Sequence, residues 1–393
     1  MNHSFPTFNR LLSVGCIALM VVLTAVTATA QRYQTSSSFD EDYIFWGYPN
    51  MYLSYQAKIA YPLIDQMLLA NPPETEPNSI RRLALVTLDQ FLHESDYQRR
   101  DAFYPFITAR MAHVFDAMNE PVWAGVRIYK LYNSGFILRT LKTTVAIDLV
   151  PGGSTTKPFL TDSVVSELAS RCDALLVTNT DSKHANRNIA KAFVDAGKVV
   201  YAPQSSTGLW NNLDAELLQI VGTDTAMTLE AKGMTLHILP GHNGRAQNNI
   251  YVMDFQGRGV VAHTGAQDND NDWTWIDQVH SQYDIDILLT KSQNTNLESI
   301  LRGFQPRLVI TAHENEMESS VDKRESYWAT QKRLQNVADL GIPNVIMTWG
   351  ESFEYADRES DNISSSANKV LKDGVLYIER KGSLYTPAGI KVK

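Results

Sequence analysis

The sequence predicts an α/β fold that is preceded by a helical segment. The 393-residue chain is 44% hydrophobic and 20% charged, which is typical of a globular protein. Before about residue 121, apolar residues recur at helical spacing, whereas later segments alternate short apolar strands with helices. Strands and helices mixed in this way predict a layered architecture with a large sheet content.

The N-terminus has the composition of an export signal. Arg10 precedes the apolar residues 11–28, and Ala28 and Ala30 provide the small side chains of a signal-peptidase site. We therefore expect residues 1–30 to be a cleaved signal peptide of the bacterial type and the protein to be exported, either periplasmic or secreted. The apolar run is nearly long enough to cross a bilayer, so an uncleaved membrane anchor is the alternative.

Charge and cysteine content narrow the function classes. The net charge of -8 gives no reason to expect nucleic acid as a partner, because nucleic-acid-binding proteins usually carry a basic face. Removal of residues 1–30 would leave Cys172 as the single cysteine, which excludes an intrachain disulfide. We expect Cys172 to be a small buried apolar residue.

Residues 31–121 are expected to form a polar lead-in and a helical extension. Segments 79–95 and 106–118 carry apolar residues at helical spacing, and the breaker "NPPETEP" separates them from an earlier apolar stretch. The predicted buried faces consist of Ile80, Ala84, Leu88, Phe91 and Leu92 in the first helix and of Ile107, Met111, Val114, Phe115 and Met118 in the second.

Residues 122–393 are expected to form the α/β domain and to end in a hairpin. Helices are predicted at 163–172, through Ile189 and Phe193 up to Gly197, and at 326–341. The closing hairpin is predicted within 374–387. Apolar strand patterns occupy 126–140 as a pair, 143–149, 174–178, 198–203, 234–240, 249–255, 259–264, 285–290, 307–313 and 345–349.

Polar side chains gather where these strands end. In a layered α/β fold such side chains meet at one rim, where binding and catalytic sites form. Asp148 closes one strand, and the cluster "TNTDSKHANRN" follows strand 174–178. The remaining polar strand ends are His242 after "LHILPG", His263 and Thr264 after strand 259–264, and His313 after strand 307–313.

In this order the segments resemble the metallo-β-lactamase-fold hydrolases. That family has a strand-terminal Asp, the loop H-x-H-x-D-H, a His after a Pro-Gly step, an Asp in an H-T-G-D-like turn and a last His. The corresponding segments here are "AIDL", "TNTDSKHANRN", "LPGHNGRAQNNIYVMDF", "VVAHTGAQDND" and "LVITAHENEM". The resemblance spans about residues 124 to 350 and implies an αββα sandwich of two mixed sheets, with the site on one edge.

The resemblance also implies ligand positions for two zinc ions, and several of these positions have changed. His184, His242 and His313 remain. An Asn amide is a weak zinc ligand, the Ala266 methyl offers no donor, and the Lys183 ammonium would repel a dication. By position, the first metal site consists of Asn179, Asp181 and His242, the second of Lys183, His184 and His313, and the bridging position is Ala266.

We therefore expect a pseudoenzyme without a metal cofactor, which binds a small molecule or a protein partner. In this hypothesis Lys183 replaces the missing cation and pairs with Asp148 and Asp181. The alternative is a hydrolase of an ester, amide or phosphodiester bond with one zinc on the three histidines. Asp148, Asp181 and Glu316 are its catalytic candidates, and Glu316 could orient an imidazole. A structural envelope protein is a third class.

Residues 268–273, "DNDNDW", begin like a calcium loop. The sixth position is Trp273 rather than Gly, and the twelfth, Val279, supplies no carboxylate. We predict a polar turn here.

Overall fold

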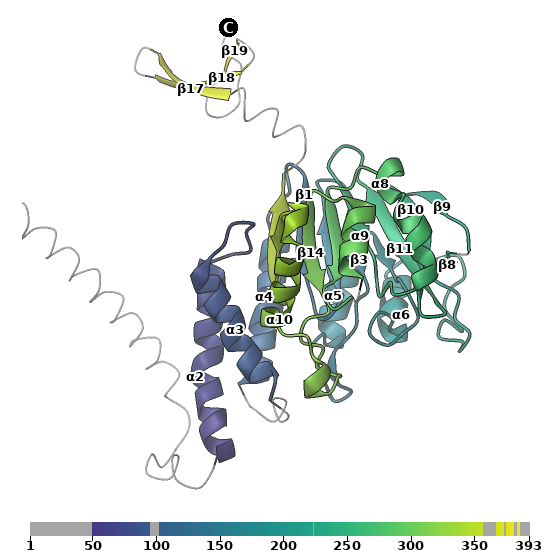
Figure 1. Ribbon diagram of the computed structural model, residues 1–393, viewed down its shortest axis with the longest axis horizontal. Helices are drawn as coiled ribbons and strands as arrows, with labels where there is room; N and C mark the ends of the chain where they lie inside the picture. Colours follow the sequence, from purple (N-terminus) through teal and green to yellow (C-terminus); the bar gives the residue numbers. More distant parts are fainter. Residues whose placement is uncertain are drawn as a thin grey trace, which may run out of the picture.

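Two mixed β-sheets packed face to face form the centre of the molecule, with helices on both outer faces (Figure 1). The computed structural model describes residues 49–94, 102–222, 224–294, 296–356, 367–372, 375–380 and 383–385. The predicted signal peptide, residues 1–30, lies outside the described residues. Among the described helices, none has both the length and the apolar character that a membrane span requires.

The first sheet has seven strands in the order β16-β1-β2-β3-β6-β7-β8. Its pairing is antiparallel from β16 to β3 and parallel from β3 to β8. The strands are β1 (Val126–Lys130), β2 (Phe136–Arg139), β3 (Thr144–Ile147), β6 (Ala174–Leu176), β7 (Val199–Ala202), β8 (Leu218–Ile220) and β16 (Glu351–Tyr355).

The second sheet repeats this arrangement in the order β15-β14-β13-β12-β11-β10-β9. Antiparallel pairing joins β9 to β12, and parallel pairing joins β12 to β15. The strands are β9 (Met227–Ala231), β10 (Met234–Asn243), β11 (Ala246–Asp254), β12 (Val260–His263), β13 (Ile287–Lys291), β14 (Leu308–Ala312) and β15 (Asn344–Val345).

Successive side chains along each strand point to opposite faces of its sheet, and this alternation explains why helices cover the outer faces. Ile128 of β1 and Leu289 of β13 enter the core between the sheets, whereas their chain neighbours Tyr129 and Leu288 face the helices. Each sheet is therefore apolar on both faces, and each outer face needs a helical layer. The predicted αββα sandwich is confirmed.

Helices cover the outer face of each sheet. The first sheet packs against α2 (Pro49–Ala70), α3 (Ser79–Leu92), α4 (Phe103–Asn119), α5 (Asp162–Arg171) and α6 (Arg187–Asp195). The second packs against α7 (Trp273–Ile276), α8 (Val279–Gln282) and α9 (Leu297–Phe304). Helix α10 (Tyr327–Asn336) joins the two layers, because Leu334 packs with the second sheet and Tyr327 with the first.

The helical extension shares its core with the first sheet. Helix α3 follows the predicted period, but its buried face is turned toward Arg81: Ile80 is 51% exposed, whereas Arg81 is 6% exposed. The prediction that Ile80 is buried is therefore wrong. The physical reason is a buried ion pair, in which Arg81 donates two hydrogen bonds of 2.7 and 2.6 Å to the carboxylate of Glu351.

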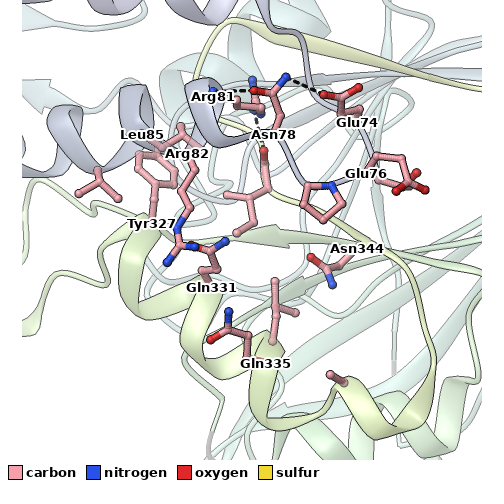
Figure 2. Close-up of a pocket in the computed structure, with 16 residues that line it drawn as sticks. Glu74, Glu76, Asn78, Arg81, Arg82, Leu85, Tyr327, Gln331, Gln335 and Asn344 are labelled. Carbon is pink, nitrogen blue, oxygen red and sulfur yellow. Dashed lines mark hydrogen bonds between the residues drawn. The ribbon is translucent and has the colours of Figure 1, made fainter.

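A cavity of about 250 Å³ lies between the start of α3 and helix α10 (Figure 2). Glu74, Asn78, Arg81 and Arg82, four of its polar lining residues, have partners inside the protein. Asn78 accepts hydrogen bonds from the backbone N–H groups of Ile80 and Arg81, and so caps α3. Arg82 stacks over Trp328 with its guanidinium 4.8 Å from the ring centre. This cavity is a gap in the packing between two helices.

Two predicted strand ends are wrong. The segment 345–349 was expected to be a strand, but β15 ends at Val345. Strand β10 continues through Pro240 and Gly241 to Asn243, because β11 pairs with it along its whole length. His242 is therefore part of a long hairpin instead of following a finished strand.

The C-terminal segment forms more than the predicted hairpin. Strands β17 (Ala367–Lys372), β18 (Val375–Arg380) and β19 (Ser383–Tyr385) make a three-stranded antiparallel sheet. Within the described residues, this sheet has no strand pairing with either large sheet.

Candidate functional site

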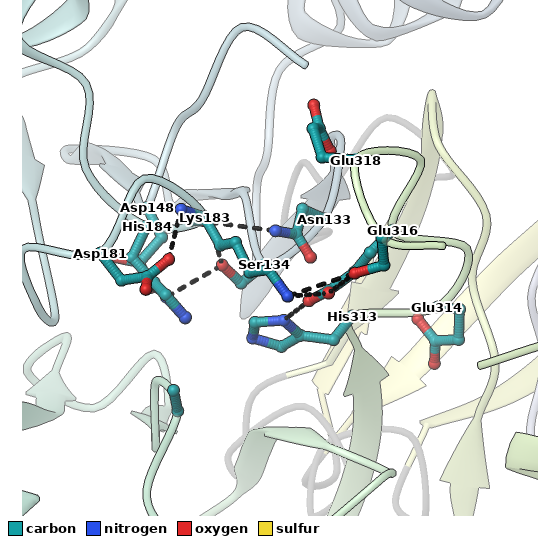
Figure 3. Close-up of polar contacts among 12 residues, drawn as sticks. Asn133, Ser134, Asp148, Asp181, Lys183, His184, His313, Glu314, Glu316 and Glu318 are labelled. Atoms are coloured by element: carbon teal, nitrogen blue, oxygen red, sulfur yellow. Dashed lines mark hydrogen bonds and ion pairs between the residues drawn. The ribbon is translucent and has the colours of Figure 1, made fainter. Parts of the chain in front are cut away.

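Loops from both sheets meet at one edge of the sandwich (Figure 3). Asp148 directly follows β3, the cluster 178–186 follows β6, and His313 follows β14. The His313 N–H donates a 3.4 Å hydrogen bond to the Asn133 carbonyl in the turn between β1 and β2. The three residues Asn133, Asp148 and His313 have positive φ values of 59°, 48° and 68°. Such backbone conformations are costly for residues other than glycine and often gather at functional sites.

Asp148 holds His184 in place. One Asp148 oxygen accepts a hydrogen bond of 2.7 Å from the Thr178 N–H, and the other lies 2.7 Å from His184 Nδ1. Because a carboxylate only accepts, Nδ1 carries the proton. Burial acts to raise the pKa of Asp148, but the charges and hydrogen bonds of His184, His263 and Thr178 hold this pKa below its ordinary value.

Glu316 connects His313 with Lys183. Its Oε1 lies 2.5 Å from His313 Nδ1, and its Oε2 accepts a hydrogen bond of 2.5 Å from Lys183 Nζ. Burial acts to raise the pKa of Glu316, yet the bonds and charges of His313 and Lys183 hold it well below the usual range. Burial also lowers the pKa of His313 to about 4, so this imidazole is neutral at neutral pH.

The two imidazoles lie side by side. The ring centres of His184 and His313 are 4.8 Å apart, and each ring is held through Nδ1 by a carboxylate. His313 Nε2 is buried, and within the described chain it has no hydrogen-bond partner. A carboxylate behind Nδ1 and a free Nε2 are also features of metal-binding histidines.

His242 is held elsewhere. Its Nδ1 lies 3.1 Å from both carboxylate oxygens of Asp272, which belongs to the turn "DNDNDW". That segment forms a short 3-10 helix, Asp270–Asp272. In the part of the chain that the structure describes, no hydrogen bond or ring contact joins His242 to His184 or His313.

Amide groups connect the changed ligand positions. Asn179 Nδ2 donates a 3.0 Å hydrogen bond to Asn248 Oδ1, and the Ala266 N–H donates a 2.9 Å bond to the same oxygen. Asn179 Oδ1 accepts a 3.0 Å bond from the Asp181 N–H, so both polar atoms of this side chain have partners. The exposed Asp181 in turn accepts a 2.9 Å bond from the Lys183 N–H.

No protein-family model and no curated protein matches the chain. Among solved structures, CmlA, a diiron β-hydroxylase from Streptomyces venezuelae, is 15% identical, and the match covers 60% of this chain and 55% of CmlA with a TM-score of 0.44. The chain thus spans about half the length of that protein. Igni18, a metallo hydrolase from Ignicoccus hospitalis, is 14% identical over 58% of this chain and 99% of its own, with a TM-score of 0.44.

A third similar structure is YhfI from Bacillus subtilis, described as a metallo-β-lactamase fold protein. It is 12% identical over 60% of this chain and 96% of its own, with a TM-score of 0.41. The architecture of this chain is itself the decisive observation: two mixed sheets between helical layers, with the polar strand ends on one edge. The chain has the αββα architecture of the metallo-β-lactamase fold.

The side chains of this metallo-β-lactamase-fold protein do not fit the two-metal centre that the resemblance implies. Within the described residues, no three His, Cys, Asp or Glu side chains are arranged to hold a metal ion. The Asn179 amide is bound to Asn248, and Ala266 has no donor atom in its side chain. The ammonium of Lys183 lies on the carboxylate that also holds His313.

One expected contact is wrong. Lys183 was expected to pair with Asp148 and Asp181, but its Nζ pairs with Glu316. Asp148 is fully buried and is occupied by Thr178 and His184, and Asp181 turns back on the Lys183 backbone. Glu316, the candidate for orienting an imidazole, lies with its Oε1 2.5 Å from His313 Nδ1.

A cavity of about 720 Å³ opens beside Lys183. The loop 150–160, helices α5 and α6 and the turn at Tyr132 and Asn133 form its walls. Gly152 allows this loop to pack closely: its φ is +58°, and a Cβ there would lie 2.5 Å from Phe159 and 2.6 Å from Tyr132. The fold therefore keeps a sizeable polar-rimmed cavity next to the site.

Several residues of the site were missed at the sequence level. Ser134 Oγ lies 3.1 Å from His184 Nδ1, Asn133 and Glu318 line the cavity, and Asn248 carries the amide network. The segment "YNSG" carried only the signal of a turn between two strands. Asn248 lies inside a strand pattern, where nothing marks an amide as functional.

Proposed function

We propose that this metallo-β-lactamase-fold protein is a pseudoenzyme that binds a small molecule without a metal ion. The observation that carries the proposal is the ion pair between Lys183 Nζ and Glu316 Oε2, at 2.5 Å. The ammonium supplies a fixed positive charge at the position where the family carries a metal-binding Asp. An ammonium repels a dication and gives up its proton only at high pH.

The amide network supports the same proposal. Asn179, Asn248 and Ala266 are joined by neutral hydrogen bonds, which need no cation to balance them. A cluster of carboxylates would require one, because buried anions without partners are costly. The neighbouring cavity of about 720 Å³ has the size of a small-molecule site, which is commonly about 300–1,000 Å³.

A hydrolase with one zinc ion is the second candidate. The observation in its favour is the pair of imidazoles of His184 and His313, each held by a carboxylate, with His313 Nε2 free of partners among the described residues. The third histidine expected for that site, His242, is also held through Nδ1 by a carboxylate, that of Asp272, but among the described residues no three His, Cys, Asp or Glu side chains are arranged to hold a metal ion. A catalytic zinc usually has three protein ligands, and this pair supplies two.

Zinc titration of a single variant tests the proposal. Lys183→Asp would restore the Asp, His, His set of the second metal site, and we expect it to bind zinc at least about tenfold more tightly than the unchanged protein in calorimetry, because an ammonium is replaced by a ligand. Lys191→Asp is the matched control, since Lys191 is exposed on α6 and makes an ion pair with Asp195. Equal, tight zinc binding by the unchanged protein and by Lys183→Asp would contradict the proposal.

Export is part of the proposal. Its support is the predicted signal peptide at residues 1–30, with Ala28 and Ala30 before the expected cleavage site. Mass spectrometry of the protein expressed in bacteria should find a mature chain that begins at Gln31. A full-length chain recovered from the membrane fraction would favour the uncleaved anchor.

A further inference from the structure

The cavity beside Lys183 is lined by both apolar and polar residues. Its apolar wall consists of Val150, Leu160, Val165, Ala185 and Ile189, all of which are at most 5% exposed. Lys183, Asn133 and Glu318 are among its polar lining residues, and Figure 3 labels all three. Ligands of such cavities have an apolar body and a polar group whose position is fixed by a few convergent protein groups.

The three polar residues form one cluster. Asn133 Nδ2 donates a 3.1 Å hydrogen bond to the Lys183 carbonyl, which places these two residues side by side. The hydroxyl of Tyr132, the residue before Asn133, donates to a carboxylate oxygen of Glu318. A ligand group that reaches this cluster can therefore contact charges of both signs.

The cluster can donate a hydrogen bond to a ligand and can also accept hydrogen bonds from it. Asn133 is 1% exposed, and among the described residues its Oδ1 accepts no hydrogen bond, which is costly unless a donor arrives. Within that same part of the chain, Glu318 makes no ion pair. Lys183 Nζ has three N–H groups and donates to Glu316 and Ser319, so one remains for an acceptor.

We propose that this cavity binds a zwitterionic α-amino acid with an apolar side chain. The carboxylate of the ligand accepts from Lys183 Nζ, its ammonium donates to Asn133 Oδ1 and Glu318, and its side chain lies along the wall of Val150, Leu160 and Ile189. A ligand with only an anionic group would pair with Lys183 alone, and a ligand with only a cationic group would pair with Asn133 and Glu318 alone. The inference rests on the proposed binding function and names its ligand class.

Calorimetric binding of three related probes tests the ligand class. The probes are L-2-aminooctanoate, octanoate, which lacks the ammonium, and octylamine, which lacks the carboxylate. We expect the amino acid to bind at least about tenfold more tightly than either analogue, because each analogue lacks one of the two charge-assisted hydrogen bonds to the protein, and about 1.4 kcal/mol corresponds to tenfold. Equal affinity of all three probes, or no binding of the amino acid, would overturn the inference.

A variant pair locates the binding site. Glu318→Gln should weaken L-2-aminooctanoate binding about tenfold, while octanoate affinity stays unchanged, since the lost charge faces the ammonium. Glu298→Gln changes an exposed glutamate on α9, outside the cavity, and should alter neither affinity. Unchanged amino-acid binding in Glu318→Gln would place the ligand elsewhere and reject the site.

The titrations with the amino acid are run with a chelator present, and zinc binding is measured separately without it. The two results then distinguish an incorrect ligand class from an incorrect claim that the protein binds no metal. Amino-acid binding under the chelator together with tight zinc uptake in its absence would remove only the metal-free claim. If the protein binds neither zinc nor the amino acid, the proposed ligand class is rejected and the metal-free binding function stands.

Discussion

At the scale of single residues, local partners could be predicted from sequence and distant partners could not. Glu316 stands three positions after His313, so a contact between them follows from chain proximity. The contact between Glu316 and Lys183 joins residues 133 positions apart and depends on how two loops of different sheets meet. The sequence predicted that Lys183 would have an acidic partner but assigned the wrong acids.

Cys172 gives a test at this scale. It is 1% exposed at the end of α5, as expected from the sequence, and burial raises the pKa of its thiol to about 12. Because the thiolate is the reactive species, the folded protein should be alkylated by iodoacetamide at pH 8 at least about 100-fold more slowly than the protein unfolded in guanidinium. The measurement is the rate at which the peptide containing Cys172 gains mass.

Ser170→Cys is the control for this labelling, because Ser170 lies on the same helix and is exposed. Its thiol should react quickly in the folded protein. Equally fast native labelling of Cys172 and of the introduced cysteine would show that α5 does not bury Cys172.

At the scale of elements, helix α3 supports the loop that carries His313 and Glu316. Asp89 of α3 accepts hydrogen bonds of 2.9 and 3.0 Å from the first N–H groups of α10, those of Tyr327 and Trp328. It also accepts a 3.0 Å bond from Asn315 Nδ2. The helical extension is therefore a structural part of the site, which its separate sequence pattern did not indicate.

Substitution of Asp89 tests this support. Asp89→Ala leaves two buried donors and one partly buried donor without their acceptor, so we expect the free energy of unfolding to fall by about 1–3 kcal/mol. Chemical denaturation measures it, with Asp116→Ala on the exposed face of α4 as the control. A loss below about 0.5 kcal/mol in Asp89→Ala, the size of ordinary surface changes, would contradict this role.

The ends of helices and strands could be predicted less well from sequence patterns than the elements themselves. Most of the helices and strands follow from apolar periodicity, whereas α7, α8 and α9 were not predicted. The end of β10 was misplaced because Pro240 and Gly241 usually interrupt a strand. Pairing with β11 carries the strand past both residues. This places His242 within the β10–β11 hairpin, and its ring contacts the acidic turn at Asp272.

At the scale of the whole molecule, the strand and helix patterns predicted an α/β fold, and the resemblance to the metallo-β-lactamase-fold hydrolases implied the αββα sandwich and the edge that carries the site. The structure agrees with this architecture, since the strands of both sheets are apolar on both faces and each outer face is covered by helices. The state of the site was harder to predict, because it depends on which side chains meet across the edge. His184 and His313 meet, whereas His242 does not join them.

Metal content tests the central claim most directly. The protein would be purified without added zinc, dialysed against zinc and then against metal-free buffer, and measured by elemental mass spectrometry. The account predicts less than about 0.1 zinc per chain, because Lys183 and the amide network oppose a dication. One zinc per chain that is lost in His313→Ala would contradict it and would favour the zinc hydrolase.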